Sequence, residues 1–204
     1  RVGPGVCYHL YTKKEYNTFP DYPIPDIAKT DLTDKLLNLM RLPSINNIGD
    51  VTELLNGLIT PPEQIFIDDA LNNLYQLGCI TGITSIDKLT GLGREITKFR
   101  SIPANMARMI IASYKYNCSR EIIKIASMLL VANGQLDNIL MNYQPSRNLT
   151  TKENKLEHQR YLKIKNKYKT NISDLLSLLN IYNDWHKNGQ KRSWCISNYI
   201  SHSM

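Results

Sequence analysis

Residues 61–78 read Pro-Pro-Glu-Gln-Ile-Phe-Ile-Asp-Asp-Ala-Leu-Asn-Asn-Leu-Tyr-Gln-Leu-Gly, and this stretch decides the fold. Its apolar residues recur at the spacing of one helix face: Ile67, Ala70, Leu71 and Leu74. A double proline is typical of a helix start, and Gly78 is typical of a helix end. The stretch therefore predicts a helix with one buried face.

The segments on either side predict a small domain around this helix. Upstream, residues 31–40 carry Leu32, Leu36, Leu37 and Met40 at helical spacing. Thr30 or Asp31 can cap that helix, and Pro43 ends it. Downstream, residues 79–82 and 88–90 flank a polar tip as the two short strands of a hairpin would, and residues 91–95 lead into a short helix. Helix, helix and small hairpin is the order of a winged-helix module.

Beyond residue 100 the pattern is helical. Helices are predicted over residues 103–116, 119–131, 173–187 and 193–200, whereas residues 132–150 are largely polar and irregular. Residues 152–169 alternate apolar residues with seven Lys/Arg against two Glu. The fold class is thus predicted as mainly α, with a helical bundle after the winged helix.

The first 26 residues differ from the rest of the chain. Residues 8–11, Tyr-His-Leu-Tyr, predict a short strand. Three prolines between positions 20 and 25 exclude both a helix and a central strand there. We therefore place a linker at residues 19–26.

The distribution of charge predicts a polyanionic partner. The net charge is +7, and residues 151–204 hold 10 Lys/Arg against 4 Asp/Glu. Phosphates attract such a patch because their neutralisation releases counterions. Lys163, Lys165 and Lys167 are the candidate contacts with nucleic acid, although their alternate spacing is equally typical of a solvated helix with several charged sides.

Other classes of protein and site are excluded by the sequence. The four cysteines form no C-x-x-C pair, and the four histidines have no metal-ligand spacing, so no metal site is predicted. No apolar run approaches the roughly 18 residues of a membrane span. Phosphate loops of the Walker type are absent, so this stretch alone is expected not to hydrolyse ATP. An intracellular protein, nuclear, cytoplasmic or viral, is expected.

Several motifs together resemble one family. Residues 1–11, Arg-Val-Gly-Pro-Gly-Val-Cys-Tyr-His-Leu-Tyr, resemble the end of helicase motif VI in the DEAH-box ATP-dependent RNA helicases. Residues 61–78 and 89–94 resemble the winged helix of that family. Residues 109–129 and 178–185 resemble helices of its ratchet domain. These motifs follow the order of the family.

The resemblance implies a domain order and a function. It implies that residues 1–18 are the tail of the second RecA-like lobe, that 27–100 form the winged helix, and that 101–204 form a truncated ratchet domain. The full-length enzyme would bind ATP and Mg²⁺ and translocate on single-stranded RNA. A glycine-rich activator protein on the winged helix is also implied.

The resemblance also implies roles for two residues. Arg1 would be the last arginine of motif VI, which stabilises the charge of the transferring phosphoryl group in the full-length enzyme. Asn133 lies in the loop that the family uses near nucleic acid, although the family's Arg-Pro pair is absent from this loop. Leu175 likewise replaces a histidine of the family.

Two functions of other classes remain open from the sequence. One is a winged-helix and helical module that binds nucleic acid or protein without ATP turnover. The other is a protein scaffold, which would show no salt-dependent RNA binding.

Overall fold

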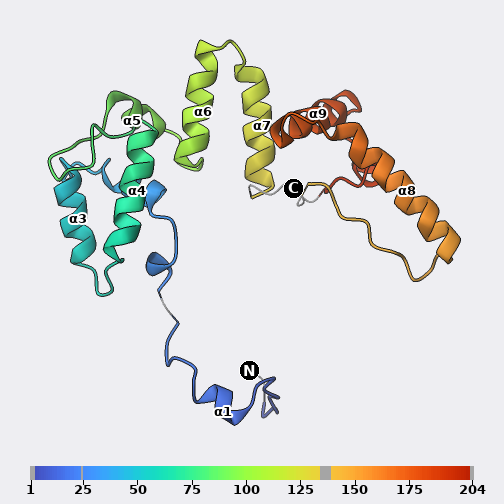
Figure 1. The fold of residues 1–204 in the computed structure, drawn as a ribbon, viewed down its shortest axis with the longest axis horizontal. Helices are drawn as coiled ribbons and strands as arrows, with labels where there is room; N and C mark the ends of the chain where they lie inside the picture. Colours follow the sequence, from blue (N-terminus) through green and yellow to red (C-terminus); the bar gives the residue numbers. More distant parts are fainter. Residues whose placement is uncertain (1–2, 24, 134–138, 203–204) are drawn as a thin grey trace. The chain divides into compact units, whose positions relative to one another are not determined.

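The computed structural model describes residues 3–23, 25–133 and 139–202. Helices dominate these residues, as predicted, and their only β structure is two isolated antiparallel bridges. The chain divides into two units, Arg1–Thr90 and Gly91–Met204. Figure 1 shows the helices of both units in chain order, by label and by colour.

The first unit is built around the predicted helix. Its elements are α1 (Lys13–Tyr16), a 3-10 turn (Asp26–Ala28), α2 (Thr33–Leu39), α3 (Ile48–Asn56) and α4 (Gln64–Gln76). The predicted apolar faces of α2 and α4 are buried and pack on each other. Helix α4 ends in a Schellman turn, in which Cys79 N–H donates to the Leu74 carbonyl over 2.8 Å. Gly78 has φ +72° there, a conformation that explains the glycine.

Helix α3 was not predicted, although its sequence carries a local signal, since Ile48, Val51 and Leu55 lie at helical spacing and are buried. Asn47 caps it by accepting from Asp50 N–H over 3.0 Å. The N–H groups of Ile48 and Gly49 donate to the carbonyls of Asp87 and Ser85, over 2.9 and 2.8 Å. These residues lie nearly 40 positions downstream. Tertiary contacts therefore satisfy first-turn donors that a short helix leaves free.

The predicted hairpin is reduced to one bridge, between Ile80 and Leu89, so two strands and a full wing are not confirmed. The tip folds around the carboxylate of Asp87 instead of continuing a ladder. That carboxylate accepts from Thr81 Oγ1 at 2.8 Å and from Thr84 N and Oγ1 at 2.8 and 2.6 Å. These bonds hold the pKa of Asp87 below its usual value. A Cβ at Gly82 would lie 2.5 Å from this carboxylate, so a larger residue there would displace the Asp87 side chain from these bonds.

The strand predicted at residues 8–11 does not form. Tyr8 and Leu10 are 86% and 100% exposed, and no strand within residues 3–23, 25–133 and 139–202 offers them backbone partners. The local signal that does act is a capping box: Glu15 N–H donates to Thr12 Oγ1, and Glu15 accepts from Thr12 N–H. It starts the short helix α1.

The second unit is a set of packed helices. They are α5 (Gly91–Ile96), α6 (Ala104–Lys115), α7 (Ser119–Val131), α8 (Thr151–Tyr168), α9 (Asp174–Lys187) and α10 (Arg192–Ser197). Helices α6 and α7 form an antiparallel pair, α7 packs on α9, and α9 packs on α8 (Figure 1). The predicted helices in this half are therefore confirmed, with bounds shifted by a few residues.

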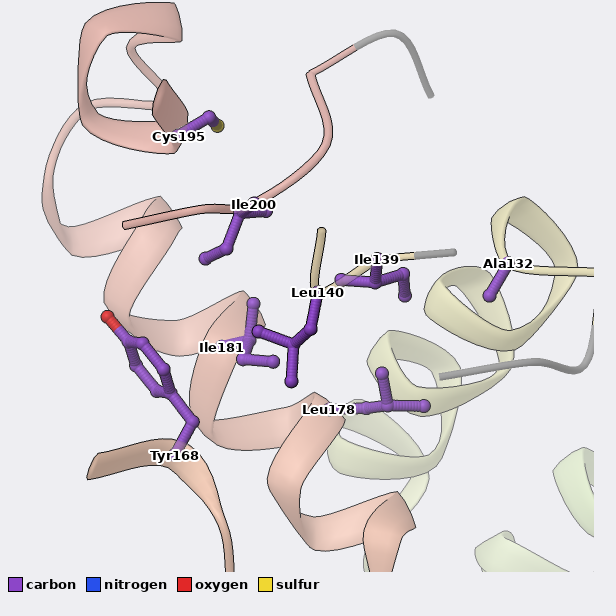
Figure 2. Close-up of a cluster of buried hydrophobic side chains, with 8 residues drawn as sticks. All are labelled: Ala132, Ile139, Leu140, Tyr168, Leu178, Ile181, Cys195 and Ile200. Carbon is purple, nitrogen blue, oxygen red and sulfur yellow. The ribbon is translucent and has the colours of Figure 1, made fainter. Parts of the chain in front are cut away.

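One hydrophobic cluster joins the later helices (Figure 2). Its buried members come from α9, from the ends of α7 and α8, from α10 and from two extended segments: Ala132, Ile139, Leu140, Tyr168, Leu178, Ile181, Cys195 and Ile200. Leu140 and Ile200 pair as an antiparallel bridge. Burial raises the pKa of the Cys195 thiol, so this cysteine stays protonated at neutral pH.

Candidate nucleic-acid interface

Helix α8 carries most of the charge that the sequence analysis selected. A capping box starts it: Glu153 N–H donates to Thr150 Oγ1 over 3.3 Å, and the Glu153 carboxylate accepts from Thr150 N–H over 2.8 Å. A further bond from Thr150 Oγ1 is the main reason that the pKa of Glu153 is lowered. The cap fixes where the helix begins, and thus which residues share a face.

Two tyrosines hold the inner face of α8 against the rest of the unit. Tyr161 and Tyr168 are 6% and 2% exposed. Glu157, also on this side, accepts a hydrogen bond from the hydroxyl of Tyr199. Burial and this bond raise the pKa of Tyr199 to about 12, so it remains a donor. These contacts fix the rotation of α8 about its axis.

A polar network at the end of α8 strengthens this attachment. Tyr168 Oη donates to Asp184 Oδ2 over 2.7 Å, and Lys167 Nζ reaches the same oxygen over 2.6 Å. Burial, followed by the bond to Asp184, raises the pKa of Tyr168 to about 12. The bonds from Lys167 and Tyr168 lower the pKa of Asp184. The network thus ties α8 to α9.

The opposite face of α8 is exposed and basic. Five of its polar residues recur every three or four positions and are exposed: Lys152, Lys155, Gln159, Lys163 and Asn166. Leu156 and Leu162, which are 59% and 42% exposed, border them. Both acidic residues of α8 lie elsewhere, because Glu153 is held by the capping box and Glu157 by Tyr199 and Arg160. We call these five residues the α8 basic face. Its lysine amines have no hydrogen bond or ion pair within the described part of the chain.

The structure separates the three lysines that the sequence grouped. Lys163 belongs to the α8 basic face and is exposed. Lys165 is half-buried, with its amine 3.3 Å from the Tyr161 hydroxyl and 5.7 Å from the centre of that ring. Lys167 is paired with Asp184. Of the three, Lys163 alone keeps its amine free of such contacts.

Two other predicted site residues lie away from this helix. Arg1 lies outside the described residues. Asn133 is exposed and follows α7 with φ +49°, and its N–H donates to the Leu130 carbonyl over 3.2 Å. Asparagine tolerates this left-handed conformation, so the turn itself accounts for the residue type. A contact between Asn133 and nucleic acid stays a prediction.

Sequence reasoning missed Lys152 and Lys155 as members of the face. The signal was present, because a Thr-x-x-Glu capping box at 150–153 sets the helix start. Counting by three and four from Lys152 then reaches Lys155, Gln159, Lys163 and Asn166.

No group of three or more His, Cys, Asp or Glu among the described residues is placed to hold a metal ion. Within the same residues, no helix combines the length and the hydropathy that crossing a membrane requires.

Known proteins resemble this chain, and one domain family matches the part that contains α8. Residues 103–178, which include α8, match the helicase associated domain (HA2), ratchet-like. The chain is 30% identical over 194 residues to a putative ATP-dependent RNA helicase, L540, of Acanthamoeba polyphaga mimivirus. It is 31% identical over 202 residues to the pre-mRNA-splicing factor ATP-dependent RNA helicase prp22 of Schizosaccharomyces pombe.

These alignments cover 95% and 98% of the chain, but the chain spans only 27% and 15% of the two relatives. The resemblance to ATP-dependent RNA helicases is therefore confirmed over nearly all of the chain. A ratchet-like helicase-associated domain is confirmed over residues 103–178.

Proposed function

We propose that this chain is an accessory region of an ATP-dependent RNA helicase, and that the α8 basic face contacts the RNA backbone. The observation that carries the proposal is the exposed face with three lysines and no acidic residue, within the ratchet-like match. The full-length enzyme would use ATP and Mg²⁺ to move along single-stranded RNA. Arg1 would then contribute to the ATP site of that enzyme.

The chemistry of the face favours phosphates over bases. Lysine amines are compact positive charges that bind phosphate without reading sequence. From Lys152 to Lys163 the helix rises by about 16 Å at 1.5 Å per residue, so one strand can meet all three amines. Gln159 and Asn166, on the same face, can donate to phosphate or sugar oxygens. The face is therefore suited to contacts that tolerate any sequence, as a moving strand requires.

The position of α8 supports the same role. Tyr161, Tyr168 and the Asp184 network anchor its inner face, so the lysines stand on a helix that is held in place. The polyanion therefore meets amines whose backbone is already ordered, and binding then costs mainly the ordering of the side chains.

Salt dependence of binding tests the proposal. The variant Lys152→Gln, Lys155→Gln and Lys163→Gln should bind a fluorescein-labelled ten-nucleotide oligouridine more weakly. The slope of log K against log salt should fall by about 2, since each phosphate contact of a single strand contributes about 0.7. Fluorescence anisotropy titrations at salt concentrations between roughly 50 and 200 mM measure this slope.

A matched variant controls for net charge. Lys14, Lys29 and Lys88 are exposed lysines of the first unit, and changing all three to Gln removes the same charge. Its slope should stay close to that of the parent chain. Equal slopes for both triple variants would show that total charge, and not the α8 basic face, drives binding.

The domain order is part of the proposal. We propose residues 1–18 as the tail of the second lobe, 19–26 as linker, 27–100 as a winged helix and 101–204 as the ratchet domain. The order α2, α3, α4 and bridged loop supports the winged helix. A glycine-rich activator protein would bind to this winged helix. A pull-down with the purified activator tests this: the parent chain should be retained, and a variant of the chain that lacks residues 27–100 should not.

A further inference from the structure

A pocket of about 330 Å³ opens in the second unit, away from the α8 basic face. It lies between α7, α9 and residues 200–202. Its floor is part of the hydrophobic cluster, since Ile139, Ile181 and Ile200 belong to both (Figure 2). Two aromatic rings, Tyr182 and Trp185, also line it, with their centroids 5.7 Å apart in a T-shaped pair. The pocket thus offers apolar and aromatic surface to a ligand.

Polar side chains line the same pocket. Ser127 of α7 and Gln190 of the α9–α10 turn are both exposed. The Ser127 hydroxyl donates to the Ile123 carbonyl over 2.8 Å and can still accept a hydrogen bond from a ligand. Gln190 is held in place by a left-handed backbone, with φ +58°, and by a 3.1 Å contact between its amide and His186 Nδ1. Apolar faces with a few polar groups match the chemistry of a nucleobase, which has flat apolar faces and a polar edge.

Three cationic residues lie next to lining residues of the pocket, either in space or along the chain. Lys124 Nζ lies 5.6 Å from the centre of the Tyr182 ring, and it donates to Asn183 Oδ1 over 2.8 Å. Lys191 and Arg192 follow Gln190 in the chain, and both are exposed. No acidic residue is among the described residues that line the pocket. An anionic ligand is therefore favoured over a neutral or cationic one.

We propose that this pocket receives one unstacked base of a single-stranded nucleic acid, with Lys191 and Arg192 meeting the adjoining phosphate. The proposal deepens the proposed function, on which it rests for the identity of the ligand. Stacking on an aromatic ring tolerates every base, which suits an enzyme that moves along a strand. A peptide with an aromatic side chain would fill the same floor, but the positive charges favour the nucleotide.

A filling variant tests the pocket without touching its aromatic rings. Ser127→Phe places a bulky ring in the pocket from an exposed position on α7. Ile123→Phe is the matched control, because Ile123 is an exposed residue one turn earlier that does not line the pocket. Ser127→Phe should weaken binding of a ten-nucleotide oligouridine about tenfold, the effect typical of one lost stacking contact. Ile123→Phe should bind as the parent chain does.

An abasic oligonucleotide of the same length separates bases from phosphates. Ser127→Phe should bind this probe as tightly as the parent chain, because the probe has no base to place in the pocket. An equal loss of affinity for both probes would overturn the proposal, as would unchanged binding of oligouridine. The triple variant of the α8 basic face should instead lose affinity for both probes.

A mononucleotide keeps the two proposals distinguishable. In a Trp194→Phe background Trp185 is the sole tryptophan, since the chain has two. Uridine monophosphate should quench its fluorescence, and Ser127→Phe should abolish the quenching. The quenching should persist in the triple variant of the α8 basic face. If uridine monophosphate does not quench the fluorescence, the pocket proposal fails. If quenching is intact but the binding of oligouridine does not depend on salt, the pocket proposal stands and the proposed contact of α8 with RNA fails.

Discussion

Helices α4 and α8 are both buried on one side, but they are held by different forces. The inner face of α4 is entirely aliphatic, with Ile67 and Leu74 almost fully buried. The inner face of α8 instead buries Tyr161 and Tyr168, and its last turn is held by bonds to Asp184. Hydrophobic burial dominates in α4, whereas α8 combines burial with directed polar bonds.

This difference explains why α8 suits a charged ligand. On α4 a long polar bond, from Asn73 Nδ2 to Thr33 Oγ1 over 3.3 Å, adds to the aliphatic face, so side-chain shape does most to set the rotation of this helix. The bonds of Tyr168 and Glu157 need particular partner atoms, so they fix the rotation of α8 and the direction of its lysines. Function on the outer face of α8 therefore depends on polar bonds on its inner face.

The largest expected effect is in α4. Leu74→Ala should destabilise the first unit by about 3 kcal/mol, because it leaves a cavity at a fully buried position. Both tryptophans, Trp185 and Trp194, lie in the second unit. Urea unfolding followed by circular dichroism should show an early transition, while tryptophan fluorescence should keep its midpoint.

An exposed neighbour provides the control for this prediction. Tyr75 lies next to Leu74 on α4 and is 53% exposed, so Tyr75→Ala should change stability by less than about 0.5 kcal/mol. If Leu74→Ala shifted the fluorescence midpoint as well, the two units would unfold together and the comparison of separate helices would fail.

The next largest effect is in the network of α8. Tyr168→Phe removes the hydroxyl that donates to Asp184, while the ring can still pack. We expect a loss of about 1.5 to 2 kcal/mol, because hydrogen bonds to charged groups contribute about 1.5 to 3 kcal/mol. The urea midpoint of tryptophan fluorescence reports it, since Trp194 lies 6.5 Å from Tyr168 between ring centroids.

Tyr182→Phe is the matched control, because the Tyr182 hydroxyl makes no hydrogen bond among the described residues. Its midpoint should stay within experimental error of the parent chain. A similar loss in both variants would mean that hydroxyl removal as such, and not the bond to Asp184, lowers stability.

Acid should weaken the same network by a smaller amount. The bonds from Lys167 and Tyr168 lower the pKa of Asp184 below 3.8, so the folded state favours the carboxylate. Their contribution is therefore complete above pH 3.8 and is lost as the pH falls through the lowered value. The effect should stay below about 1 kcal/mol, since Lys167 is largely exposed.

Comparison with Asp184→Asn isolates this contribution from those of other carboxylates. The difference in urea midpoint between the parent chain and this variant should shrink between pH 6 and pH 3. A constant difference over that range would contradict the assigned role of the carboxylate.

Much of the fold follows from local patterns in the sequence. The apolar spacing of α4 with Gly78, and the patterns of α6, α7 and α9, predicted helices that the structure confirms. The two misses have different causes. Helix α3 has a local signal that was overlooked, because Asn47 caps it and Ile48, Val51 and Leu55 lie at helical spacing. The strand predicted at residues 8–11 has no partner strand within the described residues, which a local window of sequence does not reveal.

The sequence predicted the positive charge of the candidate site, but not which of its lysine side chains are free and which are paired. Alternate lysines between 163 and 169 look equivalent in sequence, yet the amine of Lys165 contacts Tyr161 and that of Lys167 contacts Asp184. The partner of Lys167 lies 17 residues away on another helix, so spacing alone cannot reveal the pair. The other residues of the α8 basic face could be predicted from the capping box at 150–153, because it sets where the helix begins.

The smallest expected change in stability gives the sharpest comparison within α8. Lys163→Gln and Lys167→Gln are the same chemical change four residues apart on one helix. Lys163→Gln should alter stability by less than about 0.5 kcal/mol, because its amine has no partner in the described chain. Lys167→Gln should cost up to about 1 kcal/mol, because it removes an exposed ion pair.

Binding should show the reverse order: Lys163→Gln should lower the salt slope for oligouridine by about 0.7, and Lys167→Gln by less, because its amine is already paired. Equal slopes for the two variants would mean that pairing with Asp184 does not withdraw Lys167 from the RNA, and the division of α8 into an anchoring side and a binding side would be wrong.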